Sequence, residues 1–255
     1  GAGSLRLEDG RCVQFGHAVV ATGSTVAPTS LPGLEAAGYL TSDSALAEAR
    51  IPESLVVLGG GAVALEFAQF YSRLGSRVTV IQRAPQLLSG FDTDVAGELE
   101  KAFRREGIEV FTGTVLDRVD RIGSLKRVWF HHGGQERSVE AVEIFLGLGR
   151  VPNTAHLGLE AIGVTLERGR IRTDPQQRSS RAEVFAAGDC CGPHEVVHLA
   201  VQQGEVAAHN ILNPNRLRAM DYRLLLSVVF TSPQVAQVGL SEREAQSRGI
   251  DYRSE

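Results

Sequence analysis

The sequence predicts an α/β fold built on a parallel β-sheet, and three observations support this prediction. From Leu55 onwards, apolar runs of strand length alternate with amphipathic segments of helix length, as parallel β-α-β units require. A glycine cluster, Gly59–Gly61, lies between the first such strand and the first such helix. The chain of 255 residues is also long enough for one large domain or two ordinary ones.

Composition and charge narrow the class of protein. Hydrophobic residues make up 43% of the chain and charged residues 22%, as in soluble globular proteins. A formal net charge of −4 is too small to indicate a nucleic-acid partner, and no apolar run approaches the ~20 residues of a membrane span. Three cysteines do not make a disulfide framework, and the sequence shows no secretory signal. We therefore expect a cytoplasmic protein with no nucleic-acid and no membrane partner.

The segment before Leu55 gives strand and loop signals. A hairpin that turns at Asp9-Gly10 is followed by an apolar run, Ala18–Ala21, which predicts a buried strand. The stretch 27–38 is rich in Pro and Gly and predicts a loop.

Residues 55–111 predict the alternating strands and helices of the fold. The helix after the glycine cluster carries apolar residues at i, i+3, i+4 and i+7, namely Ala64, Phe67, Ala68 and Tyr71. Gly107 marks the end of the next helix. The other predicted elements are strands at Leu55–Leu58, Val78–Ile81 and Ile108–Phe111 and a helix at Asp94–Arg105.

Beyond Phe111 the pattern changes twice. Alternating segments through 126–132 and 137–149 predict an antiparallel meander, in which the pair His131-His132, beside Gly133-Gly134, indicates a turn rather than a ligand pair. Short strands and a helix near 195–212 follow, and a further unit begins at about residue 221.

The glycine cluster has the spacing of a dinucleotide-binding loop, Gly59-x-Gly61-x-x-Ala64. The first glycine permits a tight turn, the second lets a pyrophosphate approach the backbone, and the small third residue allows the helix to pack closely on the strand. The N-terminus of the helix then offers free N–H groups to the phosphates. By itself the pattern also suits a glycine-rich turn in any α/β protein. In this context we expect the nucleotide at Gly59, Gly60, Gly61, Ala62, Val63 and Ala64.

The end of the second strand predicts which nucleotide binds. In NAD sites an acid about 20 residues beyond the glycine loop accepts a hydrogen bond from the ribose 2′-OH. Gln82, 23 positions after Gly59, is neutral, and Arg83 beside it suits a 2′-phosphate. We therefore expect NADPH rather than NADH, the alternative being an ordinary solvated arginine.

Four separated motifs together resemble one family. They are "GGGAVALE" (59–66), "LGRVPNT" (148–154), "VFAAGDC" (184–190) and "VVFTSPQVAQVGLSE" (228–242). In this order they resemble the class I pyridine nucleotide-disulfide oxidoreductases. Within that family they are most similar to mercuric reductases and the dihydrolipoyl dehydrogenase group. The members of this family carry FAD and form dimers.

The resemblance implies a Rossmann-like NAD(P)-binding domain inserted in a partial FAD-binding domain, followed by the start of an α+β dimerisation domain. We expect the end of a first FAD segment at 1–37, the NAD(P) domain at 38–152, the returning FAD segment at 153–215 and a truncated interface domain at 216–255.

The resemblance also implies flavin-site residues. Asp189 matches the aspartate that hydrogen-bonds the flavin ribitol, although an Asp at a strand end also suits a turn cap. Glu66 matches a glutamate that pairs with a lysine near the flavin, although an acid in the first turns of a helix is favourable in any protein. Gly149 matches a backbone position near the nicotinamide. The remaining implied residues are Gly23, Glu195, Val196, Val197 and His198.

Three features of the family have no counterpart in these 255 residues: the first FAD fingerprint, the redox cysteine pair and the C-terminal catalytic His and Glu. We therefore expect a fragment that holds no catalytic residue. Adjacent cysteines are a strained pair for a disulfide, so we interpret Cys190-Cys191 as two small buried residues and Cys12 as inert.

Two rival functions come from other classes. "HEVVH", His194–His198, satisfies the H-E-x-x-H motif of zinc proteases, whose two histidines share a helix face. A third ligand with the right spacing does not follow, so we expect no metal site and keep zinc hydrolysis as a remote alternative. A non-catalytic NAD(P)-binding module is the nearer alternative.

The function that the resemblance implies is an FAD-dependent NAD(P)H oxidoreductase acting on a disulfide or on mercuric ion. Hydride would pass from the nicotinamide to the flavin, and electrons onward to a dithiol and the substrate. The final acceptor (mercuric ion, a lipoyl group or another disulfide) stays open. We expect a homodimer at full length, and a chain of 255 residues that alone is inactive, colourless and not a stable dimer.

Overall fold

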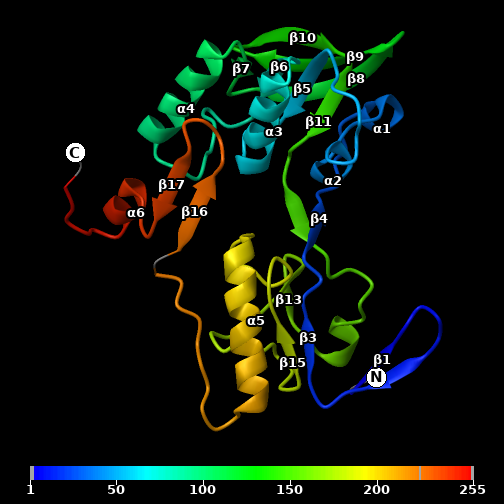
Figure 1. Ribbon diagram of the computed structural model, residues 1–255, viewed down its shortest axis with the longest axis vertical. Coiled ribbons are helices and arrows are strands. Elements are labelled where there is room, and N and C mark those ends of the chain that lie inside the picture. The colour runs from blue at the N-terminus through cyan, green and yellow to red at the C-terminus, as the bar shows by residue number, and fades with distance from the viewer. Residues whose placement is uncertain (1–2, 224, 254–255) are drawn as a thin grey trace. The chain divides into compact units, whose positions relative to one another are not determined.

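The computed structural model describes residues 3–223 and 225–253, and the chain forms two compact units (Figure 1). The first, here called the sheet unit, consists of residues 27–149 and 225–255. The second, the α5 unit, consists of residues 1–26 and 150–224. Among the described residues, no helix has the length and apolar character needed to cross a membrane.

A four-stranded parallel sheet, in the order β11-β5-β6-β7, forms the centre of the sheet unit. Every residue of the second strand in this order is buried, because it has a neighbouring strand on each side and packed side chains on both faces. The three strands predicted between Leu55 and Phe111 are confirmed. The bounds are β5 (Ser54–Leu58), β6 (Arg77–Ile81), β7 (Glu109–Phe111) and β11 (Glu143–Leu146).

Two helices connect these strands, α3 (Ala62–Arg73) and α4 (Thr93–Arg105). The apolar face predicted for the first helix is confirmed: Ala64, Ala68 and Tyr71 are buried in the core against β5 and β6. Full burial of such side chains stabilises the fold by about 1.5–3 kcal/mol for each large one.

A three-stranded antiparallel sheet follows, made of β8 (Val115–Ile122), β9 (Leu125–His132) and β10 (Gln135–Ala141). The predicted meander is confirmed for β9 and β10, with its turn at Gly133-Gly134. It is wrong for 143–146, which form β11 and pair in parallel with β5. The reason is that 144–146 form a continuous buried run, as a parallel strand covered on both faces requires.

The stretch 27–38 is not wholly a loop. It contains a short helix, α1 (Leu34–Ala37), whose Leu34 and Ala37 side chains are buried and hold it in place. A second short helix, α2 (Ser42–Ala45), begins with a capping box between Thr41 and Ser44.

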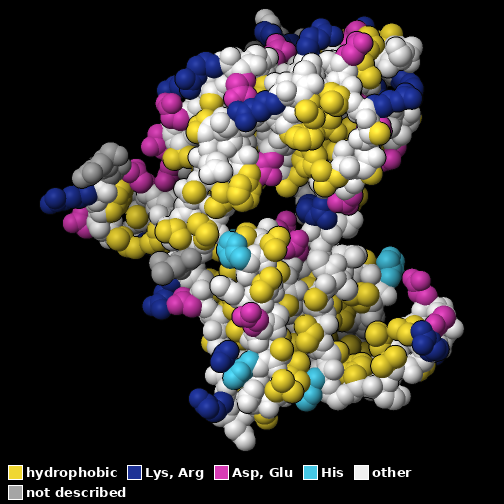
Figure 2. Space-filling view, in the orientation of Figure 1, with side chains coloured by type: hydrophobic (Ala, Val, Ile, Leu, Met, Phe, Trp, Pro, Cys, Tyr) yellow, Lys and Arg dark blue, Asp and Glu magenta, His cyan; other side chains and the backbone are white. Residues whose placement is uncertain are grey.

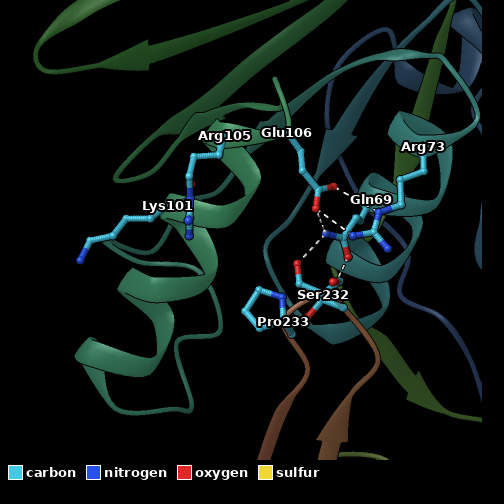
Figure 3. Close-up of polar contacts among 8 residues, drawn as sticks. Gln69, Arg73, Lys101, Arg105, Glu106, Ser232 and Pro233 are labelled. Atoms are coloured by element: carbon cyan, nitrogen blue, oxygen red, sulfur yellow. Dashed lines mark hydrogen bonds and ion pairs between the residues drawn. The ribbon is translucent and has the colours of Figure 1, made fainter.

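The C-terminal segment of the sheet unit packs on α3. A hairpin of β16 (Leu226–Val229) and β17 (Val235–Val238) is followed by α6 (Glu242–Ser247). Figure 3 shows how Gln69 of α3 holds the loop between the strands: it accepts from Ser232 N at 2.7 Å and donates to Ser232 O at 2.9 Å. Glu106 accepts in turn from Gln69 at 3.0 Å.

The α5 unit contains small two-stranded sheets and one long helix. β3 (Ala18–Val20) pairs in parallel with β15 (Val184–Ala186), and β4 (Ser24–Val26) pairs antiparallel with β12 (Arg150–Pro152). The remaining elements are the hairpin of β1 (Ser4–Arg6) and β2 (Cys12–Gln14), a 3₁₀ turn at Glu160–Ile162, β13 (Leu166–Glu167), β14 (Arg170–Ile171) and α5 (Val197–Leu212).

The two strand predictions for the start of the α5 unit differ in outcome. The hairpin turning at Asp9-Gly10 is confirmed. The strand predicted as buried at 18–21 is shorter and half-exposed, and Val19 is 44% exposed. Its sheet has two strands among the described residues, so one side of β3 lacks a covering neighbour.

The surface charge is mixed. On the face shown in Figure 2, Lys and Arg side chains alternate with Asp and Glu side chains on both units, and no large field of one sign is visible. This distribution agrees with the small formal net charge of −4.

Candidate functional site

A cleft of about 650 Å³ lies beside the glycine loop in the sheet unit. It brings together residues from the ends of β5, β6 and β11. The residues predicted from sequence that line it are Gly59, Gly60, Gly61, Gln82, Arg83 and Gly149. We call it the nucleotide cleft below.

The first two glycines are required by the close packing of the loop. Gly59 has φ +115°, and a Cβ at this position would collide with the carbonyl oxygen of Gly147. A Cβ on Gly60 would lie 3.0 Å from the Gln82 side chain. Hydrogen bonds from Gly59 N to Ile81 O at 2.9 Å and from Leu88 N to Gly60 O at 2.8 Å fix the loop to its neighbours.

Gly61 differs from both. It is the N-cap of α3, and a Cβ built on it would meet nothing within 4 Å. The space beside it is therefore free for a ligand, and the N-terminus of α3 with its positive dipole end adjoins that space. Ala64, one turn later, is buried and so close to Gly147 that any larger side chain between them would clash.

The other predicted residues of α3 do not line the cleft. Ala62 and Val63 belong to the first turn of the helix, where their backbone N–H groups face the N-terminal end. The Glu66 carboxylate lies on another side of α3, where it accepts from Phe230 N at 2.8 Å.

The end of β6 carries the pair expected to select the nucleotide. The Gln82 backbone is held on both sides, because Gln82 N donates to Phe111 O at 2.8 Å and Thr114 Oγ1 donates to Gln82 O at 3.0 Å. Arg83 is exposed and has no ion-pair partner in the described part of the chain. The rigid backbone therefore presents a free guanidinium at the cleft.

The sequence reasoning missed three stretches of the cleft wall, one of which is Gly147-Leu148, next to the predicted Gly149. Residues 29–32 come from the Pro-rich loop, and residues 115–117 come from the start of β8. The composition of 27–38 indicated a loop but not its place. Nothing in the local pattern marked Asp117, because its position depends on how β8 pairs with β9.

The residues expected at the flavin lie in the α5 unit. Asp189 follows β15, and its Oδ2 accepts from Ser24 Oγ at 2.7 Å. Ser24 Oγ accepts in turn from Arg150 Nε at 2.7 Å. Gly23 precedes β4 with φ +68° and its carbonyl accepts from Asn153 N at 2.9 Å. Gly23 and Asp189 therefore both lie just after the carboxyl ends of the parallel pair β3 and β15, where α/β folds bind ligands.

A buried glutamine holds the loop that carries Asp189. Gln203 of α5 accepts from Gly188 N at 2.7 Å and donates to Gly192 O at 2.7 Å and to Tyr222 Oη at 2.9 Å. It is fully buried. Its amide therefore closes the loop 188–192 from both ends.

The four residues 195–198 divide between a loop and a helix. Glu195 forms an ion pair with Arg170 at 2.7 Å. α5 begins at Val197, so His194 precedes the helix and His198 belongs to it. The shared helix face of the H-E-x-x-H motif is therefore absent, and the described residues contain no group of three or more His, Cys, Asp and Glu that could hold a metal ion.

The cysteines agree with a structural interpretation. Cys190 and Cys191 are unpaired and buried in the core of the α5 unit, whereas Cys12 is exposed. Hydrogen bonding to Cys190 and burial raise the pKa of the Cys191 thiol, so this thiol stays protonated at neutral pH.

Comparison with known proteins identifies relatives that match most of the chain. The family model described as pyridine nucleotide-disulphide oxidoreductase matches residues 1–204. A mercuric reductase from Staphylococcus aureus is 33% identical over 237 residues, which are 92% of this chain and 43% of that protein. A dihydrolipoyl dehydrogenase from Geobacillus stearothermophilus is 35% identical over 256 residues, which are 98% of this chain and 53% of that protein.

Solved structures agree with these sequence matches. The crystal structure of LpdA from Mycobacterium tuberculosis superimposes with a TM-score of 0.84 at 29% identity, covering 97% of this chain and 54% of that one. The HOCl-induced flavoprotein disulfide reductase RclA from Escherichia coli gives a TM-score of 0.88 at 25% identity, covering 98% and 57%. The chain spans about half the length of the curated relatives that it matches. Its mixed α/β fold, its glycine loop and these matches show that the chain belongs to the pyridine nucleotide-disulphide oxidoreductase family.

Proposed function

We propose that the sheet unit is the NADPH-binding part of an FAD-dependent oxidoreductase that reduces a disulfide or mercuric ion. The observation that carries the proposal is the contrast among the three glycines. Gly59 and Gly60 are crowded by protein atoms, whereas Gly61 faces open space at the N-terminus of α3. A loop of this shape accommodates a pyrophosphate against its backbone.

The charge at the end of β6 supports NADPH over NADH. Gln82 brings no negative charge to the cleft, and Arg83 offers a guanidinium to a 2′-phosphate. A charge-assisted hydrogen bond of this kind contributes about 1.5–3 kcal/mol when protected from water, and less at an exposed side chain.

The α5 unit supports a flavin. The Asp189 carboxylate is oriented by Ser24 at the carboxyl ends of two parallel strands, which suits an acceptor for ribitol hydroxyls. FAD would supply a carrier of two electrons between the nicotinamide and the substrate. The role of this chain's residues is to bind and orient the two cofactors. The domain boundaries at 37, 152 and 215 stay predictions.

A calorimetric titration with NADPH tests the proposal. Gly61→Val should abolish measurable binding, because the new side chain enters ligand space, and should cost at most about 1 kcal/mol of stability, because its Cβ meets no protein atom within 4 Å although valine is a poor N-cap residue. Gly97→Val is the matched control, since Gly97 lies in α4 with equally open surroundings and does not line the cleft. Normal NADPH binding by the Gly61→Val variant would contradict the proposed site.

A further inference from the structure

Asp117 lies at an irregularity of β8. The strand pairs with β9 in regular register except between Leu116 and Arg118, where Asp117 is inserted without an opposite residue. Such a bulge redirects a side chain out of the alternation of the strand, and bulges are common next to functional sites. The extra residue lines the nucleotide cleft.

Hydrogen bonds place the start of β8 beside the end of β6. Gly113 N donates to Ala84 O at 2.8 Å, and Thr114 N donates to Gln82 O at 3.1 Å. In dinucleotide-binding folds the ribose of the adenosine lies at the end of the second strand, which here is Gln82. An adenine that continued outward from that ribose would meet the start of β8, because Val115, Leu116 and Asp117 line the same cleft as Gln82.

The wall at this point combines apolar surface with one hydrogen-bond acceptor. Val115 and Leu116 line the cleft and can pack on a flat base, and Val115 is 63% exposed before a ligand covers it. Asp117 follows them. Its Oδ2 accepts from Arg118 Nη1 at 2.5 Å, whereas Oδ1 has no donor within the residues that the structure describes.

The partner of Asp117 is itself held in place. The Arg118 guanidinium lies 4.3 Å from the centroid of the Trp129 ring, and it also contacts Glu136 at 3.4 Å. The Asp117 carboxylate is therefore partly neutralised and kept in one orientation, with one oxygen left for a ligand.

We infer that Asp117 recognises the adenine of the bound dinucleotide by accepting a hydrogen bond from its exocyclic amino group. This inference rests on the proposed function of the cleft. Adenine carries an N–H donor at its 6-position, whereas hypoxanthine carries a carbonyl oxygen there. A carboxylate attracts the first and repels the second, so the cleft selects adenine dinucleotides over their deaminated analogues.

The ribose 2′-phosphate is the less suitable neighbour for this carboxylate. Two negative groups in contact repel each other, and Arg83 already offers a positive charge at the ribose end. The acceptor at the bulge therefore belongs to the base.

The test is calorimetric titration of the 255-residue chain with NADP⁺ and with nicotinamide hypoxanthine dinucleotide phosphate. The unmodified chain should bind NADP⁺ about fivefold to tenfold more tightly, the range of one hydrogen bond to a charged group at a partly exposed site. Asp117→Asn should bring the two dissociation constants to within about twofold, because an amide can donate to the hypoxanthine oxygen. Glu136→Gln is the matched control: it also removes an acid from Arg118, does not line the cleft, and should leave the preference unchanged.

The outcomes separate the two proposals. Equal binding of both nucleotides by the unmodified chain would overturn the adenine recognition and leave the nucleotide cleft intact. Binding of neither would overturn both proposals. If Asp117→Asn changed the ratio of NADPH to NADH affinity and left the hypoxanthine discrimination intact, the carboxylate would act on the ribose, and the inference would be wrong. The change in Trp129 fluorescence on binding gives a second readout, since this is the single tryptophan of the chain.

Discussion

The glycine loop of the sheet unit and the Asp189 loop of the α5 unit both follow a strand of a parallel pair, yet different contacts hold them. The glycine loop is fixed by backbone against backbone: Gly59 fits under Gly147 because it lacks a side chain. The Asp189 loop is fixed by side chains from outside the loop: Ser24, which lies 165 positions from Asp189, and Gln203 of the following helix α5. A loop of the first kind is specified by a short local motif, whereas a loop of the second kind depends on long-range hydrogen bonds.

The largest effect that tests this comparison is expected from Gly59→Val. Valine at position 59 would have to adopt φ +115°, which β-branched residues rarely do, and its Cβ would overlap the Gly147 carbonyl oxygen. We expect the free energy of unfolding to fall by about 3 kcal/mol or more, measured by urea denaturation. Gly61→Val is the control and should lose much less, at most about 1 kcal/mol, because its Cβ meets no protein atom within 4 Å and only the N-cap preference is lost. Equal stability of the two variants would show that backbone packing does not hold the glycine loop.

The next effect is expected from Gln203→Leu. This nearly isosteric change leaves Gly188 N and Gly192 O without their Gln203 partner, whereas Tyr222 Oη keeps its hydrogen bond with Gln177 at 3.2 Å. Unsatisfied buried groups cost about 1–3 kcal/mol each, and partial relaxation should leave a loss of about 2–4 kcal/mol in urea denaturation. Gln202→Leu, at the exposed neighbouring position, is the matched control. The account of the Asp189 loop fails if both variants have the same stability.

A smaller effect is expected at the selective end of the nucleotide cleft. Arg83→Ala should weaken NADPH binding about tenfold, or about 1.4 kcal/mol, and leave NADH binding nearly unchanged. Gln82→Glu should move the preference towards NADH, because the new carboxylate repels a 2′-phosphate. Arg77→Ala is the control, since Arg77 is an exposed arginine at the opposite end of β6. A comparable loss in the Arg77 variant would mean that general charge, rather than position, attracts the nucleotide.

The smallest effect concerns the contacts in Figure 3. Hydrogen bonding from Arg73 and from Gln69 lowers the pKa of Glu106 below its ordinary value of about 4.5. A lowered pKa in the folded state means that the contribution to stability is present above pH 4.5 and is lost as the pH falls through the folded value. For this partly exposed pair we expect at most about 1 kcal/mol. Comparing urea denaturation at pH 7 and pH 3.5 for Glu106→Gln and the unmodified chain checks this: the difference should shrink at the acidic pH.

Local patterns predicted the parts of the fold that local interactions determine. The strands at 55–58 and 78–81 and the apolar face of α3 follow from short runs and helical spacing, and the structure confirms them. The sequence predicted 143–146 as part of the meander because the parallel pairing of β11 depends on β5, which lies about 90 residues earlier. Local residue propensities do not predict which distant strand a segment pairs with.

The candidate site divides in the same way. The glycine loop could be predicted from the sequence because the spacing of its small residues is itself a local motif, in which each residue meets a separate backbone requirement. Asp117 was not, because a bulge is defined by the partner strand and leaves no local pattern. The bond between Ser24 and Asp189 spans 165 positions of the chain, and the sequence indicated Asp189 only through its resemblance to a family motif.

The most direct test of the central claim is a calorimetric titration of the unmodified chain with NADPH and with NADH in the same buffer. The account predicts that NADPH binds at the nucleotide cleft about tenfold more tightly, because Gln82 removes the repulsion and Arg83 adds an attraction. Equal or tighter binding of NADH would contradict it.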